Sequence, residues 1–207
     1  MKIELLSITH DAEKLIEIAG RISHLSYNNQ TEDSQRTFVK KMVKLGHLSV
    51  LEHAYATFKI SGISRACSHQ LVRHRLCSFT QQSQRYVDES NFEYVEPDSI
   101  RKNSDAHELF CNFMQNSKQV YAKLIELGIE KEDARYVLPN ATQTQIVITA
   151  NFREWRHIIE LRGDINSQWE IRRVVIEILK ILKNHAPSAF DDFEIDEERE
   201  IIVKKEF

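Results

Sequence analysis

The chain has few glycines and prolines, which break regular structure, and few cysteines, which form the disulfides of small secreted domains. Five glycines and three prolines in 207 residues argue against a disordered or loop-dominated protein. Cys67, Cys77 and Cys111 are odd in number and form no CxxC pair, which is typical of reduced thiols in a cytoplasmic protein. No apolar run reaches the length of a membrane span, and the N-terminal segment MKIELLSITHDAEK lacks the apolar core of a signal peptide. We therefore expect one cytoplasmic domain over residues 1–207.

One stretch also lacks acidic residues. From His53 to Val87 there is no Asp or Glu over 35 residues, although 31 acids in 207 residues would place about five there. The stretch does carry basic residues, namely Lys59, Arg65, Arg73, Arg75 and Arg85. In a chain of net charge −3, this pattern predicts a local positive site from which acids are kept out. Arginine guanidinium groups with nearby amide and hydroxyl donors are suited to bind a phosphate or a phosphorylated small molecule. We therefore favour this interpretation over that of a solvated basic surface.

Hydrophobic periodicity predicts an α+β fold in which helices outnumber strands. The expected strands are Lys2–Thr9, Ala54–Ile60 and Thr142–Thr149, and Tyr86–Val95 has strand-like character. The expected helices run from Asp11 to about Ser23, over Asp33–Leu45, Ile63–His74, Ser104–Leu127 and Glu130–Val137, from Asn151 onward, and over Ser167–Lys183. Gly46 and Gly128 are expected to end the helices before them. The C-terminal segment, about 191–207, is acidic, and we expect it to be a solvated tail without chemistry.

The apolar positions predict which helix faces are buried. In the first helix these are Leu15, Ile18, Ala19 and Ile22. In the Ser104–Leu127 helix they are Leu109, Phe110, Phe113, Met114, Val120, Tyr121, Leu124 and Ile125.

The segment QLVRHRLCSFTQQSQRY, Gln70–Tyr86, contains a spaced pattern of basic and hydroxyl residues. Its members are Arg73, His74, Arg75, Ser78, Ser83 and Arg85. All six fall in the register of the signature of flavin-dependent thymidylate synthases, which this segment resembles. Three further segments resemble that family in the right order: Gly46–His53 (GHLSVLEH), Ala134–Asn140 (ARYVLPN) and Asn151–Arg162 (NFREWRHIIELR), the last followed by Gln168, Trp169 and Glu170.

The resemblance implies a fold, an assembly and a reaction. The resemblance implies an α+β domain with a central mixed or antiparallel sheet flanked by long helices. The family assembles as a homotetramer, with active sites at subunit interfaces. Its bound cofactor is FAD. Its reaction converts dUMP to dTMP, with 5,10-methylenetetrahydrofolate as the carbon donor and NADPH, through the flavin, as the reductant. No enzyme nucleophile is needed.

The resemblance also implies the site residues. Contacts to dUMP would come from Gln70, Leu71, Val72, Arg73, Gln81, Gln82, Ser83, Gln84, Arg85, Arg135 and Arg162. Contacts to FAD would come from Ser49, Arg73, His74, Arg75, Leu76, Gln81, Asn151, Phe152, Arg153 and His157. Arg162 would be catalytic, because the matching family residue bonds the uracil edge and promotes ionisation of its N3.

Several of these residues also admit structural interpretations. Arg162 precedes Gly163 and fits a helix C-terminal arginine facing the dipole, and Arg135 fits a surface charge on a short helix. We expect Ser83 to orient substrate, because no general base lies at a useful spacing. Cys77 occupies an unspecified position of the signature, so we assign it to packing.

The nine histidines do not form a recognisable metal-binding motif. The spacings His47–His53 and His69–His74 match neither HExxH nor a zinc finger, so no metal is predicted. The alternative function is a non-catalytic module that binds a nucleotide or RNA through the basic stretch. It would bind in a salt-sensitive manner and without flavin. A metal-dependent nucleotide hydrolase would need a ligand set that the motifs do not supply.

Overall fold

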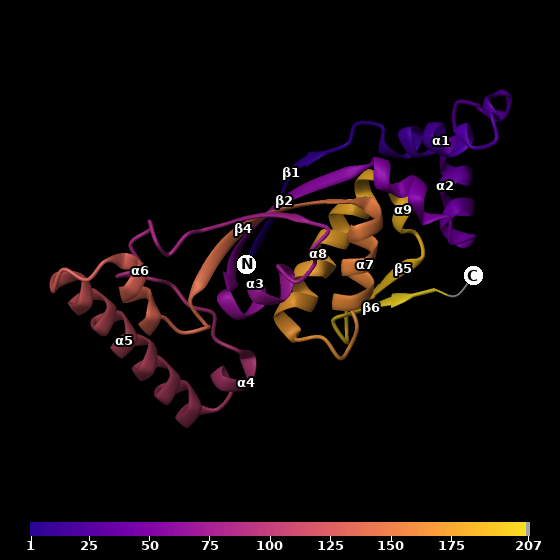
Figure 1. The fold of residues 1–207 in the computed structure, drawn as a ribbon. Helices are drawn as coiled ribbons and strands as arrows, with labels where there is room; N and C mark the ends of the chain where they lie inside the picture. The colour runs from indigo at the N-terminus through magenta and orange to yellow at the C-terminus, as the bar shows by residue number, and fades with distance from the viewer. Residues whose placement is uncertain (206–207) are drawn as a thin grey trace. The chain divides into compact units, whose positions relative to one another are not determined.

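The computed structural model describes residues 1–205, and both helices and strands are well represented (Figure 1). The strands are β1 (Lys2–Ile8), β2 (Tyr55–Ser64), β3 (Ser78–Gln81), β4 (Gln143–Asn151), β5 (Phe193–Asp196) and β6 (Ile201–Lys204). The helices are α1 (Ala12–Ile22), α2 (Ser34–Lys44), α3 (Arg65–Leu71), α4 (Asp98–Arg101), α5 (Ser104–Glu126), α6 (Lys131–Ala134), α7 (Phe152–Arg162), α8 (Trp169–His185) and α9 (Pro187–Phe190). Short 3-10 helices are η1 (Tyr27–Asn29), η2 (Leu48–His53) and η3 (Arg135–Val137). This composition agrees with the predicted α+β class. Within residues 1–205, no helix has both the length and the apolarity needed to cross a bilayer.

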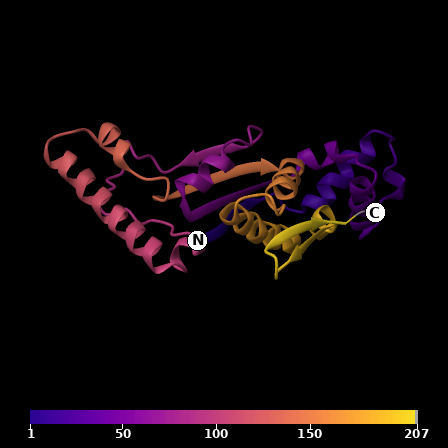
Figure 2. The ribbon, with the colours of Figure 1, turned by 90° about the horizontal axis from the view of Figure 1, so that it is seen from below.

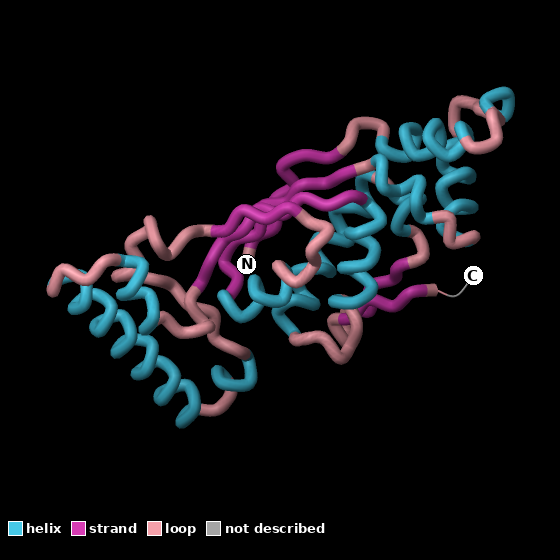
Figure 3. The backbone as a smooth tube through the Cα atoms, viewed as in Figure 1, coloured by secondary structure: helices cyan, strands magenta, loops and turns pink. Residues whose placement is uncertain are grey.

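The chain folds into two compact units. The α5 unit comprises Met1–Lys2, Ile60–Gln70 and Thr80–Ile146. The α7–α8 unit comprises Ile3–Lys59, Leu71–Phe79 and Val147–Phe207, described here as far as residue 205. The four-stranded sheet has the order β1-β2-β4-β3, and β5 pairs with β6 in a separate sheet (Figure 3). A single domain over residues 1–207 stays a prediction.

The core of the α7–α8 unit forms where two amphipathic helices pack side by side (Figure 1). The Asn151 side chain caps α7 by accepting a 2.8 Å hydrogen bond from the Glu154 amide, as predicted from the sequence. Trp155 of α7 is fully buried, stacks edge-on against Phe58 at 5.1 Å, and donates a 3.0 Å hydrogen bond to the Ala56 carbonyl. The indole thus joins α7 to β2 by both packing and a satisfied polar group.

The predicted acidic tail is a folded hairpin over most of its length. β5 and β6 pair antiparallel with Phe193 opposite Lys204, and β6 lies against α7 and α8 (Figure 2). Asp192 is buried and accepts two hydrogen bonds from Arg156, at 2.6 and 2.5 Å. The prediction of a solvated tail is therefore wrong for this segment, although residues 206–207 of the predicted tail lie outside the described residues.

The α5 unit is organised by its 23-residue helix, with α4 and α6 packed against it (Figure 1). Asn103 caps α5 by accepting hydrogen bonds from the Asp105 and Ala106 amides, both at 3.1 Å. Gly128 follows the helix with φ +80°, which fits its predicted role as the terminator. Tyr121 is fully buried, and its hydroxyl accepts a hydrogen bond from the Glu89 amide.

Three expected elements differ from those in the structure. β2 continues through Gly62 to Ser64 because Gly62 adopts φ +70°, which lets the strand pass without breaking. The expected Ile63–His74 helix is therefore the shorter α3, Arg65–Leu71. Tyr86–Val95 is not a strand: it contains only an isolated bridge from Tyr94 to Thr142.

The expected buried faces of α1 and α5 are also wrong in part. On α1, Leu15, Ile18 and Ile22 are 37, 40 and 56% exposed, and the buried side includes Ile16, Glu17 and Arg21 instead. The buried Arg21 donates two hydrogen bonds to Glu17, so a polar pair occupies the inward face. On α5, Leu109, Phe113 and Val120 are exposed, whereas Met114 and Tyr121 are buried.

Candidate active site

The signature segment passes through three kinds of backbone structure. α3 ends at Leu71, turns follow to Cys77, β3 occupies Ser78–Gln81, and a second turn contains Gln84 to Tyr86. Gln70, Arg73 and His74 therefore do not share one helical edge, contrary to the sequence-based expectation. His74 is buried and the arginines on either side of it are exposed. The tight turn thus sends the histidine inward and both guanidinium groups outward.

In the α7–α8 unit, His74 contacts the arginine that we expect to be catalytic. Arg162, the last residue of α7, donates a hydrogen bond from Nε to His74 Nε2 at 3.0 Å. Burial, and then the charge of Arg162, lower the pKa of His74 from 6.5 to about 4. The imidazole is therefore neutral at pH 7. Because Nε2 accepts, the proton of the neutral ring sits on Nδ1.

The Nδ1 side of His74 faces a buried carboxyl group. Glu154 Oε1 lies 3.6 Å from His74 Nδ1, and burial raises the pKa of Glu154. Glu154 was not among the predicted site residues, although it lies on α7 between Asn151 and His157. The hydrogen bond to His74 orients the Arg162 guanidinium, whereas Glu154 only lies near the other side of the imidazole ring, beyond hydrogen-bond distance.

Cys77 lies near the same carboxyl group and is not set up as a nucleophile. Burial, with a contribution from the negative charge of Glu154, raises the pKa of its thiol to about 12. The thiol is thus protonated at neutral pH. This agrees with the assignment of Cys77 to packing.

The remaining predicted flavin-binding residues of this unit present a mixed donor set. His157 is exposed, and its ring stands edge-on to that of His74 at 5.7 Å. Arg153 is exposed and pairs with Glu52 at 2.5 Å, and Ser49 lines an open cleft of about 840 Å³ beside α1 and α2. Phe152 is fully buried, so only its backbone is available to a ligand. Exposed guanidinium groups and imidazole edges suit a pyrophosphate and an aromatic ring system, respectively, and the contact of these residues with a flavin stays a prediction.

Other residues of the signature segment differ in their exposure to solvent. Arg75 and Leu76 are exposed beside His74, and Val72 and Arg73 are exposed in the preceding turn. Leu71 is fully buried, so like Phe152 it would contribute backbone groups only.

In the α5 unit, two glutamines of the signature belong to hydrogen-bond networks. Gln81 donates to Ser68 Oγ at 2.9 Å and to Thr144 Oγ1 at 3.2 Å. Gln82 donates to Glu89 Oε1 at 2.9 Å, and its own Oε1 accepts from Gln145 at 3.2 Å. Gln82 and Glu89 both line an open cleft of about 770 Å³. These contacts fix the amide orientations, as a hydrogen-bonding recognition surface requires.

The arginines predicted to bind nucleotide in this unit share one partner residue. Arg85 Nε forms an ion pair with the Glu132 carboxylate, and Arg135 Nε donates to the Glu132 carbonyl at 2.9 Å. Ser83 Oγ accepts from the Arg85 amide at 3.2 Å, while Gln84 beside it is buried. Gln70, at the end of α3, is half-buried.

The prediction that acids are kept out of the site is wrong in three dimensions. The stretch has no acid of its own, but Glu132 pairs with Arg85, Glu89 contacts Gln82, and Glu154 faces His74. Glu132 and Glu154 come from distant segments of the chain, whereas Glu89 follows the stretch by two residues and lies seven residues from Gln82. No local spacing links Glu132 and Glu154 to the signature, so the sequence alone could not indicate these two.

Comparisons with known proteins give evidence that is separate from this geometry. Residues 4–188 match the family model described as thymidylate synthase complementing protein. A protein of Geobacter sulfurreducens named "Flavin-dependent thymidylate synthase" is 43% identical over 200 residues, covering 93% of this chain and 86% of that protein. Proteins of the same name from Mycolicibacterium gilvum and Corynebacterium efficiens are 41% identical over 198 residues and 38% over 204, covering 87% and 90% of this chain and 79% and 82% of their own lengths.

The match covers both compact units and includes the signature, Arg135, the α7 helix and Arg162. The resemblance found in the sequence is thereby confirmed. The chain belongs to the thymidylate synthase complementing protein family.

Proposed function

We propose that this protein is a flavin-dependent thymidylate synthase that converts dUMP to dTMP. The carbon donor is 5,10-methylenetetrahydrofolate, and the reducing equivalents come from NADPH through bound FAD. Family membership over residues 4–188 carries the proposal. The site geometry supports it, because Arg162 is held by a neutral histidine in the manner that a fixed electrostatic donor requires.

The electron count of this reaction fixes its folate product. A methylene group and two electrons make the methyl group of dTMP. Because NADPH supplies both electrons, the folate leaves as tetrahydrofolate rather than dihydrofolate. Bound flavin supplies the hydride-transfer chemistry that links NADPH to the nucleotide.

The residues of this chain would bind and orient the reactants. Arg162 would bond the uracil edge and stabilise negative charge that develops on the ring, while His74 holds its guanidinium in place through the Nε hydrogen bond. Around the nucleotide phosphate, Arg85 would exchange its ion pair with Glu132 for the dianion. Ser83 would orient dUMP, and no enzyme nucleophile is involved. For the other residues that would bind dUMP and FAD, we propose the same contacts that the sequence resemblance implies.

The assembly and location are also part of the proposal. We place the enzyme in the cytoplasm as a homotetramer whose subunits share active sites. The exposed apolar residues Leu15, Ile18 and Ile22 on α1 support association, because an apolar helix face of this kind is typical of a subunit interface. Multi-angle light scattering of the purified chain tests the tetramer directly.

The reaction is tested by anaerobic NADPH oxidation. The purified chain with FAD and 5,10-methylenetetrahydrofolate is assayed with and without dUMP, and both the nucleotide and the folate products are identified. The proposal expects dTMP and tetrahydrofolate in equal amounts, formed only when dUMP is present. Salt-sensitive nucleotide binding without any dTMP would instead support a non-catalytic binding module.

A further inference from the structure

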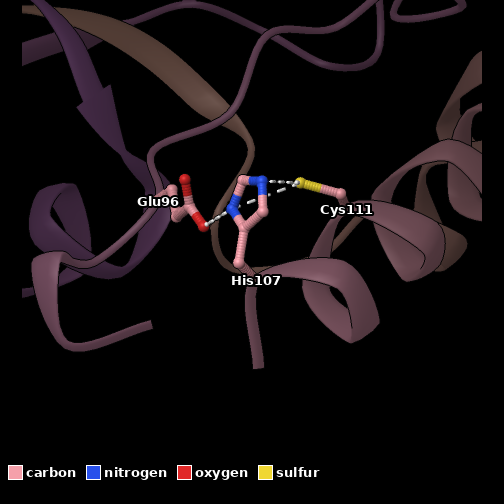
Figure 4. A group of neighbouring side chains, drawn as sticks. All are labelled: Glu96, His107 and Cys111. Carbon is pink, nitrogen blue, oxygen red and sulfur yellow. Dashed lines mark hydrogen bonds and ion pairs between the residues drawn. The ribbon is translucent and has the colours of Figure 1, made fainter. Parts of the chain in front are cut away.

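Three side chains with metal-binding atoms converge in the α5 unit, outside the site described above. Glu96 lies in the loop before α4, and His107 and Cys111 lie in the first turns of α5 (Figure 4). His107 Nδ1 is 2.6 Å from Glu96 Oε1, and Cys111 Sγ is 3.8 Å from His107 Nδ1 and 3.7 Å from Nε2. One ligand atom from each residue lies within 4.8 Å of the other two.

The backbone explains why these groups meet. His107 and Cys111 are four residues apart on a helix, so they project from the same face. The cap by Asn103 fixes the start of that helix, and the His107 amide also donates to the Asn103 carbonyl at 2.8 Å. Glu96 approaches from the loop before α4, and its side chain is less exposed than that of His107.

A tetrahedral metal ion would require small movements of these side chains. Zinc bonds of about 2.0–2.1 Å to nitrogen and about 2.3 Å to sulfur place the two ligand atoms about 3.5 Å apart. Cys111 Sγ lies 3.8 Å from Nδ1 and 3.7 Å from Nε2, but an ion binds only one of these nitrogens, so the thiol would have to move towards the lone pair of that nitrogen. The contact between Glu96 and His107 is a hydrogen bond. A metal ion bound to both residues would need a longer oxygen–nitrogen distance, so the carboxylate would have to move away by about 1 Å.

The charges around the cluster argue both for and against a cation. A carboxylate, a thiolate and a neutral imidazole together would balance a divalent ion. However, Arg101 Nε lies 3.5 Å from Glu96 Oε2 and competes for the same carboxylate. Tyr94, whose hydroxyl is 3.8 Å from Cys111 Sγ, adds a polar neighbour without adding charge.

We propose that Glu96, His107 and Cys111 bind a divalent cation of the zinc class, with water in the fourth position. The combination of nitrogen, sulfur and oxygen ligands is typical of zinc rather than of magnesium or calcium. The ion would fasten the loop before α4 to the start of α5. The spacing His107-x-x-x-Cys111 is the sequence signal, and it differs from the HExxH and zinc-finger patterns. The proposal does not rest on the proposed function.

Cobalt(II) is the direct probe, because a thiolate ligand gives a charge-transfer band and a tetrahedral site gives intense visible absorption. The full metal-free chain is titrated with cobalt and then with zinc. We expect one cobalt per chain, with both spectral features, and displacement by zinc. Absence of a stoichiometric thiolate–cobalt signal would overturn the proposal.

Single substitutions identify the ligands. Cys111→Ser should abolish the charge-transfer band and weaken zinc binding by at least about 100-fold, since loss of an outer-shell partner alone costs about 10–100-fold. His107→Gln and Glu96→Gln should each weaken binding by a comparable amount. The matched controls are Cys77→Ser, another thiol, and Glu108→Gln, an exposed acid next to His107. Both should bind as the parent chain does.

One further variant tests the cluster without removing a ligand. Arg101→Gln removes the competing cation and should tighten zinc binding, which a purely structural ion-pair cluster would not predict. Circular dichroism of each variant confirms that it is folded. A cobalt band that survives Cys111→Ser, or control substitutions that weaken binding equally, would place the metal elsewhere.

Discussion

The same Asp-to-Asn substitution should have very different costs at two adjacent residues of the C-terminal segment. Asp192 is buried and forms a bidentate pair with the buried Arg156, whose Nη1 also donates to the Ala189 carbonyl. Asp191 forms its ion pair with Lys40 at 2.6 Å, and both of those side chains are about half exposed. Asp192→Asn therefore leaves a buried guanidinium without its counter-charge, whereas Asp191→Asn breaks a solvated pair.

The expected magnitudes follow from this difference in burial. Breaking a buried pair by removing one charge costs about 3–5 kcal/mol. Asn keeps one carbonyl oxygen that can still accept from Arg156, so we expect the lower end, about 3 kcal/mol. For a chain of this size, about 2–4 °C of melting temperature is lost per kcal/mol, which gives a decrease of roughly 6–12 °C. Asp191→Asn should cost about 0–1 kcal/mol.

Thermal unfolding followed by circular dichroism at neutral pH measures both variants under the same conditions. Moderate salt should reduce the small effect at Asp191 further and leave the effect at Asp192 nearly unchanged, because buried charges are screened much less. Equal shifts for the two variants, or a neutral result at Asp192, would refute the argument from burial.

Three further predictions concern the proposed active site. Arg162→Lys keeps the charge but loses the Nε donor to His74 and the planar guanidinium group, so kcat should fall about 10²–10³-fold. Steady-state kinetics measure this change, with the exposed Arg36→Lys as the control. An unchanged kcat would remove Arg162 from its catalytic role. Because the pKa of His74 is lowered to about 4, the native chain leaves this ring neutral while the unfolded chain protonates it below about pH 6.5. The stabilisation from neutral His74 is thus complete above about pH 6.5 and lost as the pH falls towards 4, by up to about 3 kcal/mol. Unfolding free energies of the parent and His74→Asn between pH 4 and 7 check this, and parallel pH curves would contradict it. Ser83→Ala should weaken dUMP binding and leave kcat largely intact, as isothermal titration and turnover measure; abolished turnover with unchanged dUMP affinity would restore the nucleophile hypothesis.

Features governed by local chemistry were predictable from the sequence. Asn151 caps α7, and Gly46 and Gly128 adopt positive φ after α2 and α5, because a cap or a left-handed turn depends on a few adjacent residues. The alternation of Ala56, Phe58 and Ile60 correctly predicted one buried face of β2.

Features governed by distant contacts were not. The pair of Arg156 and Asp192 joins residues 36 positions apart, and the sequence around Asp192 looks like a solvated acidic tail. The contact between His74 and Arg162 joins residues 88 positions apart. Periodicity could not show that α1 buries Glu17 and Arg21, since mutual pairing makes an inward polar face stable.

The family could be identified from the sequence, and both its model and the curated relatives confirm it. The site itself was only partly accessible. The basic residues of the signature were visible, but Glu132 and Glu154 lie in other segments and became neighbours only through the fold.

The central claim is that this chain makes dTMP by flavin-dependent chemistry. The most direct measurement is dTMP formation from dUMP, 5,10-methylenetetrahydrofolate and NADPH by the chain stripped of flavin, before and after FAD is added back. We predict no dTMP before the addition, and dTMP with tetrahydrofolate after it. Formation of dTMP without FAD, accompanied by dihydrofolate, or no dTMP after FAD is restored, would contradict the account.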